Sequence, residues 1–548
     1  MRAGSVSDAK VARMRSLLID RMICMPPRSE SGPSLHQNLS LLCLPKACLS
    51  RERTCLSVHW PVFRSLLRNA RRTLVVDDRR SYTGAELIVA AFHVADEIEK
   101  RCSAPQIGLM LPTSAAFPIA ALASWMLGRV IVPLNYLLKK EELDYVVEHS
   151  GIDAVVTVGP MLDAVGYRPN VQSVIEMDKL DFSSVPSLRW PSLKGDDELA
   201  ALLYTSGTTG KPKGVMLTHG NLISNIHQGA QGMHATKHDT FLGVLPQFHC
   251  FGVTQLTLTP LVYGAKVVYT ARFSPPKIFE LARKHHASVF IGIPSMYAAL
   301  INAKSGKPDA FSSMKIMVSG AEPLPDATLE RFREKFGVKI CEGFGMTELS
   351  PATNVSLPEC TKRHSVGRPL PGIEQRIVDP ATEEEVAVGQ EGELRLRGPN
   401  LMAGYYKRES DTANTIDNQG YMRTGDIARI DEDGYLYITG RIKEMIIVGG
   451  ENVFPREVEE VLNKHAAVDA SGAIGMQDPM RGEVIIAFVE LMEGGQTTAD
   501  ELRVWCRDQL PGYKCPREVH IVEALPRNPV GKILRKDLHT MLPVHAQG

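Results

Sequence analysis

The chain has 548 residues, of which 44% are hydrophobic and 23% charged, which is typical of a globular protein with more than one domain. Lys+Arg and Asp+Glu each total 62, so no overall field favours binding to nucleic acid. The ten cysteines show no CxxC pair or regular spacing. The pattern indicates neither a zinc site nor a disulfide framework, and it favours a reducing, cytoplasmic location.

Residues 1–56 differ from the rest of the chain. They contain four of the ten cysteines among Pro, Ser and Arg, without a sustained hydrophobic period. No continuous apolar block of the kind found in secretory signals is present there. We expect a poorly ordered N-terminal extension, with a transit peptide as the alternative.

The longest uncharged stretch, residues 106–128, raises the question of a transmembrane segment. Pro112 and Pro118 interrupt it, so a buried strand at 106–111 followed by an apolar helix fits better. We expect no transmembrane segment, and contact with a membrane surface is left open.

Short apolar runs alternate with helical stretches through most of the chain. Strands are expected at 154–158, 266–269, 288–293 and 315–318, and helices at 276–286 and 326–335. This alternation predicts an α/β fold with mostly parallel sheets.

The pattern changes after Gly392. Segments 393–397 and 431–438 are rich in β-forming residues and turns. A final unit of helix, strand, strand, helix and strand is expected at 455–464, 468–476, 483–491, 498–509 and 518–522. We therefore place the boundary of a small C-terminal α+β domain near Gly440.

One segment has the composition of a phosphate-binding loop. It follows an apolar strand at 199–204 and contains Thr205, Ser206, Gly207, Thr208, Thr209, Gly210, Lys211, Pro212, Lys213 and Gly214. Glycines allow the backbone to approach an anion, hydroxyl and N–H groups donate hydrogen bonds to phosphate oxygens, and lysines supply positive charge. The loop is not a Walker A motif, because Pro212 stands where Ser or Thr is required.

This loop resembles the signature loop of the adenylate-forming (AMP-binding) superfamily, which includes acyl-CoA synthetases, luciferases and peptide synthetase domains. Further segments match in family order: FHCFG at 248–252, SGAEP at 319–323, GFGMTE at 343–348, YMRTGD at 421–426, GRIKE at 440–444, GGENV at 449–453 and PRNPVGK at 526–532. The resemblance spans residues 60 to 540, and seven ordered matches exclude chance.

The resemblance implies a large N-terminal domain at 57–440, made of two α/β subdomains and a β-barrel. A small, mobile α+β lid follows at 441–548, with a hinge at 440–443 that includes Lys443. Rotation about this hinge would exchange the two faces that the lid presents to the site.

The chemistry explains why such a site needs cations. A thiol cannot displace oxide from a carboxylate, so the acid is first joined to AMP, and this brings a carboxylate against a triphosphate. By resemblance, Glu348 holds Mg²⁺, Thr347 contacts phosphate, and Lys213 in the loop and Lys532 near the C-terminus complete the catalytic set. Lys532 is expected to reach the carboxylate and the α-phosphate.

The remaining matched residues are assigned by resemblance to nucleotide, thiol and acid. Asp426 takes the ribose hydroxyls, Arg441 contacts ribose and phosphate, and Phe344 offers an aromatic face to adenine in place of the more usual tyrosine. Backbone lining of the adenine and acyl pocket is assigned to Gly320, Ala321, Glu322, Gly343 and Gly345. The face presented to the thiol is assigned to Gly449, Gly450 and Glu451, and the acid pocket to His249 and Gly320, with a purely structural role as the alternative for His249.

We therefore expect an ATP-dependent acyl-CoA synthetase that activates a carboxylic acid as acyl-AMP and transfers it to coenzyme A, with ATP and Mg²⁺. The FHCFG segment and the small residues at 292–295 and 319–320 favour a medium- or long-chain fatty acid. The alternatives are an acyl carrier protein as acceptor, an aromatic acid, a luciferase-like oxidation and a non-enzymatic nucleotide sensor, the last disfavoured by Glu348, Asp426 and Lys532. No oligomeric state is indicated.

Overall fold

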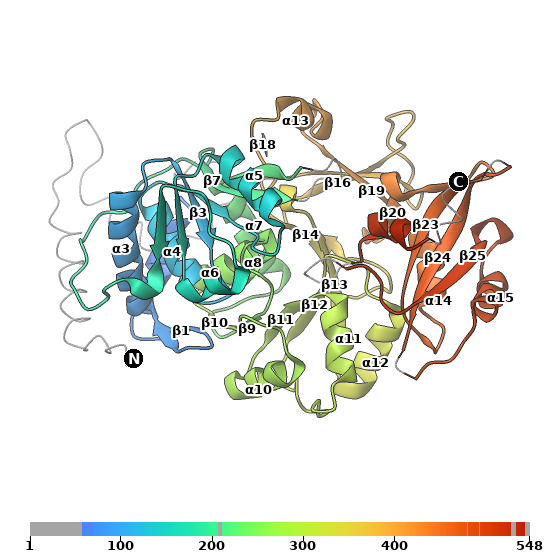
Figure 1. The fold of residues 1–548 in the computed structure, drawn as a ribbon, viewed down its shortest axis with the longest axis horizontal. Helices are drawn as coiled ribbons and strands as arrows, with labels where there is room; N and C mark the ends of the chain where they lie inside the picture. The colour runs from blue at the N-terminus through green and yellow to red at the C-terminus, as the bar shows by residue number, and fades with distance from the viewer. Residues whose placement is uncertain (1–56, 206–210, 479, 493, 528–532, 543–548) are drawn as a thin grey trace.

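The computed structural model describes residues 57–205, 211–478, 480–492, 494–527 and 533–542. The expected extension at 1–56 lies outside the described residues, as do loop residues 206–210 and Lys532. In Figure 1 the chain runs from the N-terminal sheets, drawn in blue and green, to a C-terminal domain in orange and red at the opposite end.

The larger N-terminal sheet carries the strands whose ends form most of the candidate site. Within the described residues it has nine strands, and the six in its middle run parallel. In sheet order they are β15 (Arg368–Pro369), β14 (Ala352–Val355), β13 (Ile340–Gly345), β12 (Ile316–Ser319), β11 (Val289–Gly292), β9 (Thr240–Gly243), β10 (Lys266–Tyr269), β1 (Thr73–Val76) and β2 (Ser81–Thr83).

The second N-terminal sheet ends in the hairpin that frames the phosphate loop. Its seven strands in the described part of the chain are β18 (Gly404–Tyr405), β8 (Lys213–Thr218), β7 (Leu199–Thr205), β4 (Val130–Pro133), β3 (Gln106–Met110), β5 (Ala154–Thr157) and β6 (Ser173–Glu176). Strand β5 is buried along its whole length, as a parallel strand covered on both faces should be.

Helices pack around and between these two sheets. They are α2 (His59–Arg68), α3 (Gly84–Arg101), α4 (Ala116–Met126), α5 (Lys140–Ser150), α6 (Gly159–Val165), α7 (His219–Gly232), α8 (Cys250–Val253), the π-helix η3 (Thr254–Leu258), α9 (Thr259–Tyr263), α10 (Pro275–His285), α11 (Pro294–Asn302) and α12 (Asp326–Phe336). The short 3₁₀ turns are η2 (Met177–Lys179) and η4 (Thr347–Leu349). Strand β8 passes directly into α7, where the Thr218 hydroxyl accepts a hydrogen bond from the Asn221 N–H at 3.1 Å, which fixes the start of the helix.

The segment expected to form a β-barrel is a four-stranded antiparallel sheet, with α13 (Glu409–Thr415) beside it. Its strands in the described residues follow the linear order β16 (Glu374–Val378), β17 (Gly392–Arg397), β19 (Met422–Ile430) and β20 (Leu436–Arg441). A separate cluster of buried side chains, including Leu394, Leu396 and Leu436, packs against it.

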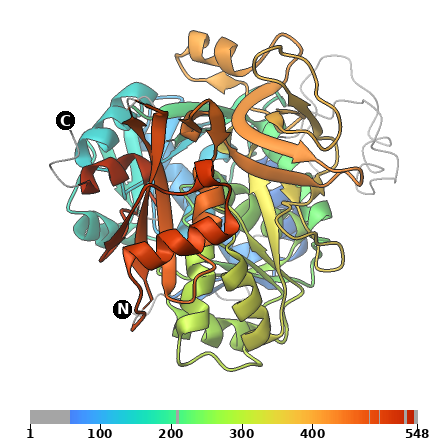
Figure 2. The same cartoon turned by 90° about the vertical axis from the view of Figure 1, so that its right-hand side faces the viewer.

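The C-terminal unit has a core of its own. Its sheet of five strands in the described residues comprises β22 (Glu451–Val453), β21 (Ile446–Val448), β24 (Gly482–Leu491), β23 (Val468–Asp478) and β25 (Glu518–Val522). The helices are α14 (Pro455–Leu462), α15 (Ala499–Gln509) and α16 (Arg535–Leu538), with 3₁₀ turns η5 (Ile442–Glu444), η6 (Gly512–Lys514) and η7 (His539–Met541). Figure 2 looks onto this unit, and its buried residues form clusters distinct from those of the N-terminal sheets.

The structure confirms the expected class: a large N-terminal α/β part and a small C-terminal domain. The helix, strand, strand, helix, strand order of the last unit is present as α14, β23, β24, α15 and β25. Of the helices described, none has both the length and the apolar character needed to cross a bilayer. The exact position of the domain boundary stays a prediction, because β20 runs through Gly440 to Arg441.

Candidate functional site

The phosphate-binding loop connects two paired strands. Thr205 at the end of β7 and Lys213 at the start of β8 lie opposite each other in the antiparallel register. Ser206, Gly207, Thr208, Thr209 and Gly210, between them, lie outside the described residues. Lys211 is exposed, with its Nζ atom 5.2 Å from the centre of the Tyr145 ring. The framework of the predicted loop is therefore a hairpin, and its two lysines both lie on the β8 side.

Glu348 lies beside this hairpin, in the turn η4 that follows β13. Its Oε1 atom accepts a hydrogen bond from the Tyr405 hydroxyl at 2.8 Å, and its carbonyl accepts one from the Met402 N–H at 2.8 Å. The Lys213 Nζ atom lies 4.9 Å from the centre of the Tyr405 ring. Tyr405 therefore connects the predicted metal ligand to the predicted loop lysine, and Thr347 precedes Glu348 in the same turn.

Tyr405 and Asp411 are site residues that the sequence analysis missed. Burial, together with the negative charge of Glu348, raises the pKa of the Tyr405 hydroxyl, so it remains a hydrogen-bond donor at neutral pH. Asp411 forms an ion pair with the Lys213 Nζ atom at 3.2 Å. The GYY sequence at 404–406 was the available signal, but its contact with Glu348 spans 57 positions and cannot be read locally.

The carboxyl ends of three neighbouring parallel strands form the predicted adenine platform. Gly320 directly follows β12, and its N–H donates to the carbonyl of Gly292 at the end of β11, at 3.2 Å. Gly343, Phe344 and Gly345 end β13. Crevices at the carboxyl ends of parallel strands are the usual ligand sites of such sheets.

At this edge of the sheet, close packing leaves no room for a side chain at Gly345. A Cβ atom on Gly345 would lie 2.2 Å from the carbonyl oxygen of Pro351. Ala321 adopts a left-handed conformation with φ of 69°, a conformation that a residue with a side chain rarely holds.

The Glu322 carboxylate interacts electrostatically with Arg535 of the C-terminal domain, so this side chain faces the lid.

Asp426 and Arg441 are brought together on adjacent strands. They are register partners in β19 and β20, and the Arg441 Nε atom lies 2.8 Å from Asp426 Oδ1. The Asp426 side chain is 1% exposed and the Arg441 side chain is 47% exposed. The carboxylate is therefore buried, whereas the guanidinium faces solvent. This geometry suits a carboxylate that accepts hydrogen bonds from two hydroxyls.

His249 directly precedes α8 and is partly buried. Burial lowers its pKa to about 4, so the ring is neutral at physiological pH. Its Nε2 atom has no hydrogen-bond partner among the described residues. Burial also raises the pKa of the neighbouring Cys250 thiol, which therefore packs as an uncharged group and is not an activated thiolate.

A pocket opens between the platform and the helices behind it, and we call it the central pocket. It is lined by Gly229 and Met233 of α7, Phe251, Gln255, Ile291, Val318, Gly343, Phe344, Ala352, Asn354, Val355 and Leu370. Ile291 and Val318 immediately precede the segments 292–295 and 319–320 that were expected to line an acid pocket. Gln255, Ala352 and Asn354 were missed, because only the fold brings η3 and β14 to β13.

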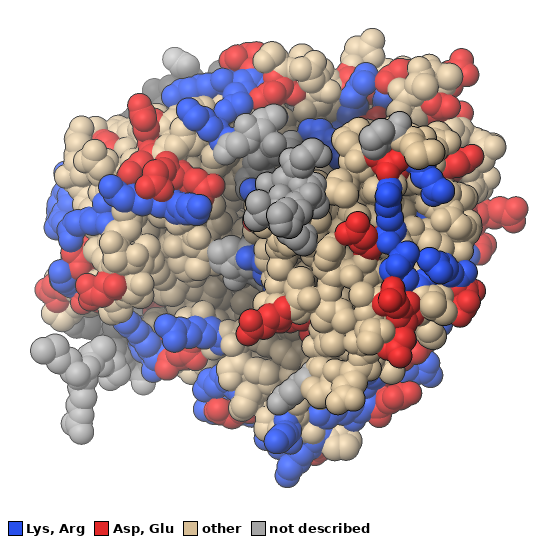
Figure 3. Space-filling view, turned by 45° about the vertical axis from the view of Figure 1, so that its right-hand side comes forward, with Lys and Arg blue, Asp and Glu red and all other residues tan. Residues whose placement is uncertain are grey.

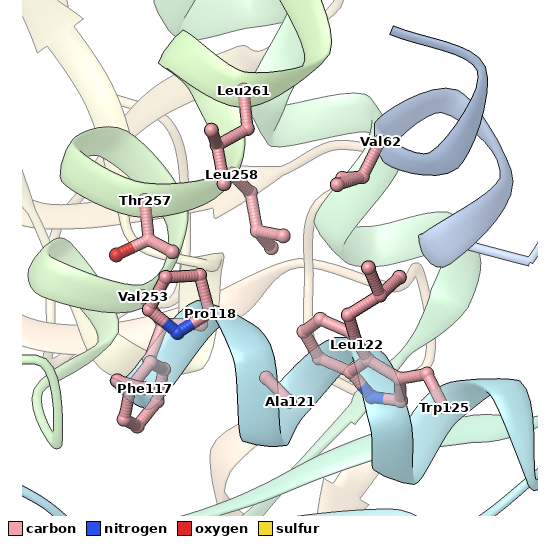
Figure 4. Close-up of a pocket in the computed structure, with 10 residues that line it drawn as sticks. All are labelled: Val62, Phe117, Pro118, Ala121, Leu122, Trp125, Val253, Thr257, Leu258 and Leu261. Atoms are coloured by element: carbon pink, nitrogen blue, oxygen red, sulfur yellow. The ribbon is translucent and has the colours of Figure 1, made fainter. Parts of the chain in front are cut away.

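A second, apolar cavity lies on the other side of η3, and we call it the α4 cavity. It is lined by Val62, Phe117, Pro118, Ala121, Leu122, Trp125, Val253, Thr257, Leu258 and Leu261 (Figure 4). Since η3 contributes Gln255 to the central pocket and Thr257 and Leu258 to the α4 cavity, this π-helix is the partition between them.

The predicted thiol face is an exposed turn of the C-terminal domain. Gly449, Gly450 and Glu451 form the exposed turn between β21 and β22, with φ of 62° and 88° at the two glycines. Lys443 lies in η5, beside Arg441. The roles given to these residues, and to Lys532, stay predictions.

A magnesium ion fits the donors around Glu348. Among the described residues, no cluster of three or more His, Cys, Asp or Glu gathers around one point. Mg²⁺ in nucleotide enzymes takes one or two carboxylates and completes its shell with phosphate oxygens and water. Glu348, beside the phosphate hairpin, would supply that carboxylate.

Comparison with known proteins agrees with this geometry. The AMP-binding enzyme family model matches residues 62–406, and the model of the AMP-binding enzyme C-terminal domain matches 457–532. A long-chain-fatty-acid–CoA ligase of Bacillus subtilis is 30% identical over 82% of this chain and 88% of its own, and a feruloyl-CoA synthase of Amycolatopsis sp is 31% identical over 87% and 97%. The solved o-succinylbenzoate coenzyme A synthetase of Bacillus subtilis, in complex with ATP and magnesium ion, has a TM-score of 0.77 and 31% identity, covering 87% of this chain and 99% of its own.

Proposed function

The chain belongs to the AMP-binding enzyme family as an adenylate-forming acid–CoA ligase that uses ATP, Mg²⁺ and coenzyme A, and we propose that its acid is a fatty acid of medium or long chain. The observation that carries this proposal is the apolar wall of the central pocket. The wall is formed by the apolar side chains of Met233, Phe251, Ile291, Val318, Val355 and Leu370. Such a surface gains free energy by removing an alkyl chain from water.

In the first half-reaction the acid carboxylate attacks the α-phosphate of ATP and pyrophosphate leaves. Glu348 would hold Mg²⁺, which would offset phosphate charge together with Lys213 and the N–H groups of the loop. Asp426 and Arg441 hold the ribose, and Phe344 with the glycines at 343 and 345 supports the adenine. Lys532, from the C-terminal domain, neutralises the carboxylate and α-phosphate as they meet.

In the second half-reaction the thiol of coenzyme A attacks the acyl carbon and AMP leaves. The lid at 441–548 turns about Lys443, removes Lys532 and brings Gly449, Gly450 and Glu451 to the site. His249, which with Gly320 is predicted to face the acid, stays neutral. A charged imidazolium there would need a counter-charge that its buried surroundings do not provide.

An aromatic acid is the second candidate. The rings of Phe251 and Phe344 both line the central pocket, and an aryl group stacks favourably against such rings. Feruloyl-CoA synthase is among the similar proteins. The two candidates share one chemistry and differ only in the acyl group.

Acid-dependent ATP–pyrophosphate exchange tests the proposal. A panel of short, medium and long fatty acids and of aromatic acids would be assayed with ATP and Mg²⁺, and active acids would then be incubated with coenzyme A or acyl carrier protein. We expect exchange with medium- or long-chain acids and thioester formation with coenzyme A. Exchange confined to short or aromatic acids would overturn the fatty acid assignment.

A further inference from the structure

Both lysines of the phosphate hairpin rest on a tyrosine ring, and the two rings belong to different elements. The Lys213 Nζ atom lies 4.9 Å from the centre of the Tyr405 ring in β18. The Lys211 Nζ atom lies 5.2 Å from the centre of the Tyr145 ring in α5. An ammonium group over the face of an aromatic ring is attracted to it, so the two rings help to fix where the lysines point.

Arg408 connects the two lysine sites. Its Nη1 group donates to Asp411 Oδ2 at 3.2 Å, and the same oxygen pairs with the Lys213 Nζ atom at 3.2 Å. Its Nη2 group donates at 3.3 Å to the hydroxyl of Tyr145, the side chain on which Lys211 rests. One guanidinium therefore holds a partner of each lysine, as its planar fork of donors allows.

The backbone from which Arg408 extends is a closed turn between β18 and α13, at the top of Figure 1. The Arg408 N–H donates to the carbonyl of Tyr405 at 3.1 Å. The Arg408 carbonyl accepts from the N–H and the hydroxyl of Thr412, at 3.1 and 3.0 Å, and this hydroxyl accepts from the Tyr405 N–H at 2.9 Å. A fixed base lowers the entropy cost of holding a long side chain in one position.

Tyr145 is anchored to the strand that leads into the hairpin. Its ring stacks on His149, with ring centres 5.2 Å apart, and His149 Nδ1 lies 2.8 Å from the hydroxyl of Tyr204 in β7. Burial lowers the pKa of His149, and the charges of Lys407 and Arg408 lower it further. The imidazole is therefore neutral at physiological pH and adds no charge to the anchor.

Three cations share one carboxylate beside the hairpin. Burial opposes the ionisation of Asp411, but Lys213 and Arg408 outweigh it and lower the pKa, so the carboxylate is charged at neutral pH. In the part of the chain that the structure describes, no acidic side chain forms an ion pair with Lys211. The group keeps an excess of positive charge, as a polyphosphate site requires.

We propose that Arg408 is a positioning residue that acts on both lysines of the hairpin at once. It holds Lys213 through Asp411. It holds Lys211 through Tyr145, so that both ammonium groups can offset the charge of pyrophosphate as it leaves. This inference rests on the proposed function, because it takes the hairpin as the phosphate site. Arg408 itself need not touch phosphate, since both of its terminal nitrogens are already bonded.

Arg408→Met tests this role, because it removes the guanidinium and keeps the aliphatic stem. The readouts are the affinity of the full chain for pyrophosphate with Mg²⁺, by isothermal titration calorimetry, and the KM values for ATP and for the acid in pyrophosphate exchange. We expect the affinity to fall about fivefold to tenfold and the KM for ATP to rise by a similar factor. The KM for the acid should stay near wild type, a separation that a general loss of structure would not give.

A double-mutant cycle separates positioning from direct contact with phosphate. Lys213→Met removes one of the two lysines, so the effect of adding Arg408→Met should shrink to about threefold or less in that variant. Lys407→Met is the matched control, because it removes a neighbouring cation whose Nζ atom bonds the carbonyl of His149 at 2.9 Å. It should stay within about twofold of wild type in pyrophosphate affinity.

Arg408→Lys serves as the second variant if methionine destabilises the fold. It keeps the charge but should also lose pyrophosphate affinity, because one ammonium cannot hold both Asp411 and Tyr145.

The outcomes separate the two proposals. If Arg408→Met binds pyrophosphate as tightly as wild type, if its effect is undiminished in Lys213→Met, or if Lys407→Met loses as much, the positioning role is wrong and the ligase proposal stands on the exchange assay. If the wild-type chain binds no pyrophosphate and exchanges it with no acid of the panel, both are overturned.

Discussion

Tyr405 connects two predicted site residues, Glu348 and Lys213. Its hydroxyl binds Glu348 and its ring lies under the Lys213 ammonium, which also pairs with Asp411. These contacts give the Glu348 carboxylate a hydrogen-bond donor and the Lys213 ammonium a counter-charge. We infer that Tyr405 and Asp411 hold Glu348 and Lys213 in the positions where they would bind Mg²⁺ and phosphate.

Glu348→Gln tests the metal assignment. The amide oxygen can still accept the Tyr405 hydrogen bond, so the fold should be retained, but the negative charge that binds Mg²⁺ is lost. We expect adenylation to fall by a few kcal/mol in activation free energy, about the effect of removing one electrostatic stabiliser. Pyrophosphate exchange measured over a Mg²⁺ titration checks this.

Tyr405→Phe is the matched control, because it removes the hydrogen bond to Glu348 and keeps the ring. Its loss should be smaller, about 1 kcal/mol. Wild-type turnover of Glu348→Gln at limiting Mg²⁺ would contradict the assignment.

At the residue scale, the sequence could reveal those candidate site residues that lie within short motifs. Glu348, Asp426 and Arg441 lie in such motifs, and the structure places Glu348 beside the loop and pairs Asp426 with Arg441. Tyr405 could not be found in that way. Its significance comes from a contact between distant segments, which exists only in the folded chain.

At the scale of single elements, the π-helix η3 separates the central pocket from the α4 cavity, so its side chains help to determine the shape of the central pocket. A π-helix inserts an extra residue per turn and turns the side chains that follow, which is a frequent feature of functional sites. Here it directs Gln255 toward Gly229 and the central pocket, and Leu258 toward the α4 cavity. The segment TQLTL gave no sequence signal for this, because its composition is that of an ordinary helix.

Gln255→Ala should enlarge the central pocket. The deletion removes the wall over Gly229, one of the two donors to Asn225 Oδ1 and the acceptor of the Thr259 hydroxyl, so it should cost about 1–3 kcal/mol of stability while raising activity toward bulkier or longer acids relative to wild type. Thermal unfolding and pyrophosphate exchange over the acid panel measure the two effects.

Leu258→Ala creates a void on the opposite face of η3 and serves as the control. It should lose stability but keep the acid preference. An unchanged preference in Gln255→Ala would show that this residue does not bound the acyl site.

Helix α2 is held to the body of the domain by two buried histidines. His219 Nδ1 accepts a hydrogen bond from the Val58 N–H at 3.2 Å, and His59 Nε2 bonds the Ser192 carbonyl at 3.0 Å. Burial lowers the pKa of His59 to about 3, and the nearby His219 lowers it further. Burial lowers the pKa of His219 to about 4, an effect that Glu198 opposes and Lys194 reinforces.

These shifts predict acid destabilisation. Below a pH of about 6.5 the unfolded chain binds protons that the folded chain excludes, so stability is full above that pH and falls as the pH drops toward 4. Each histidine should contribute a few kcal/mol to this fall. His219→Gln, whose amide oxygen can accept the Val58 N–H without titrating, should flatten the dependence of the unfolding midpoint on pH between 6.5 and 4. An unchanged slope in this variant would contradict the assignment.

The elements themselves were largely predictable. Strands such as β5, β10 and β12 are short, apolar and buried, so a continuous apolar run was a sufficient signal. The four-stranded sheet between β16 and β20 was harder to define, because closure into a barrel depends on pairing between strands far apart in sequence.

At the scale of the whole molecule, the two domains meet through opposite charges. Arg456 of α14 donates to the carbonyl of Ile438 and faces Glu342, whose pKa burial raises to about 7 although Arg456 opposes the shift. Arg535 binds Glu459 and Glu444 within the lid and also interacts with Glu322. Elsewhere, acidic and basic side chains are interspersed over the visible face (Figure 3).

This interface connects the lid to the platform. Glu322 follows Gly320 and Ala321, and Glu342 precedes Gly343, so the lid's arginines interact electrostatically with the two segments predicted to hold adenine. Movement of the lid would change the charges around both segments. The arrangement supports a division of labour in which the lid takes one position for each half-reaction.

Lys532 and Lys443 test this division. Lys532→Ala should reduce acyl-adenylate formation by about 10²-fold or more, because the charge that offsets carboxylate and α-phosphate is removed. Thioester formation from supplied acyl-adenylate and coenzyme A should stay near wild type, since Lys532 has left the site by then. Mass spectrometry of adenylate and thioester follows the two steps separately.

Lys443→Pro should give the opposite profile. Proline fixes φ and removes an N–H group at the point where the backbone must turn, so the rotation that precedes thioester formation should be slowed more than adenylation. Lys443→Ala keeps the backbone free and should stay near wild type in both steps. If Lys532→Ala slows both steps equally, or if Lys443→Pro affects adenylation more than thioester formation, the lid does not alternate between the half-reactions, and the electrostatic interactions of its arginines with Glu322 and Glu342 belong to a fixed interface.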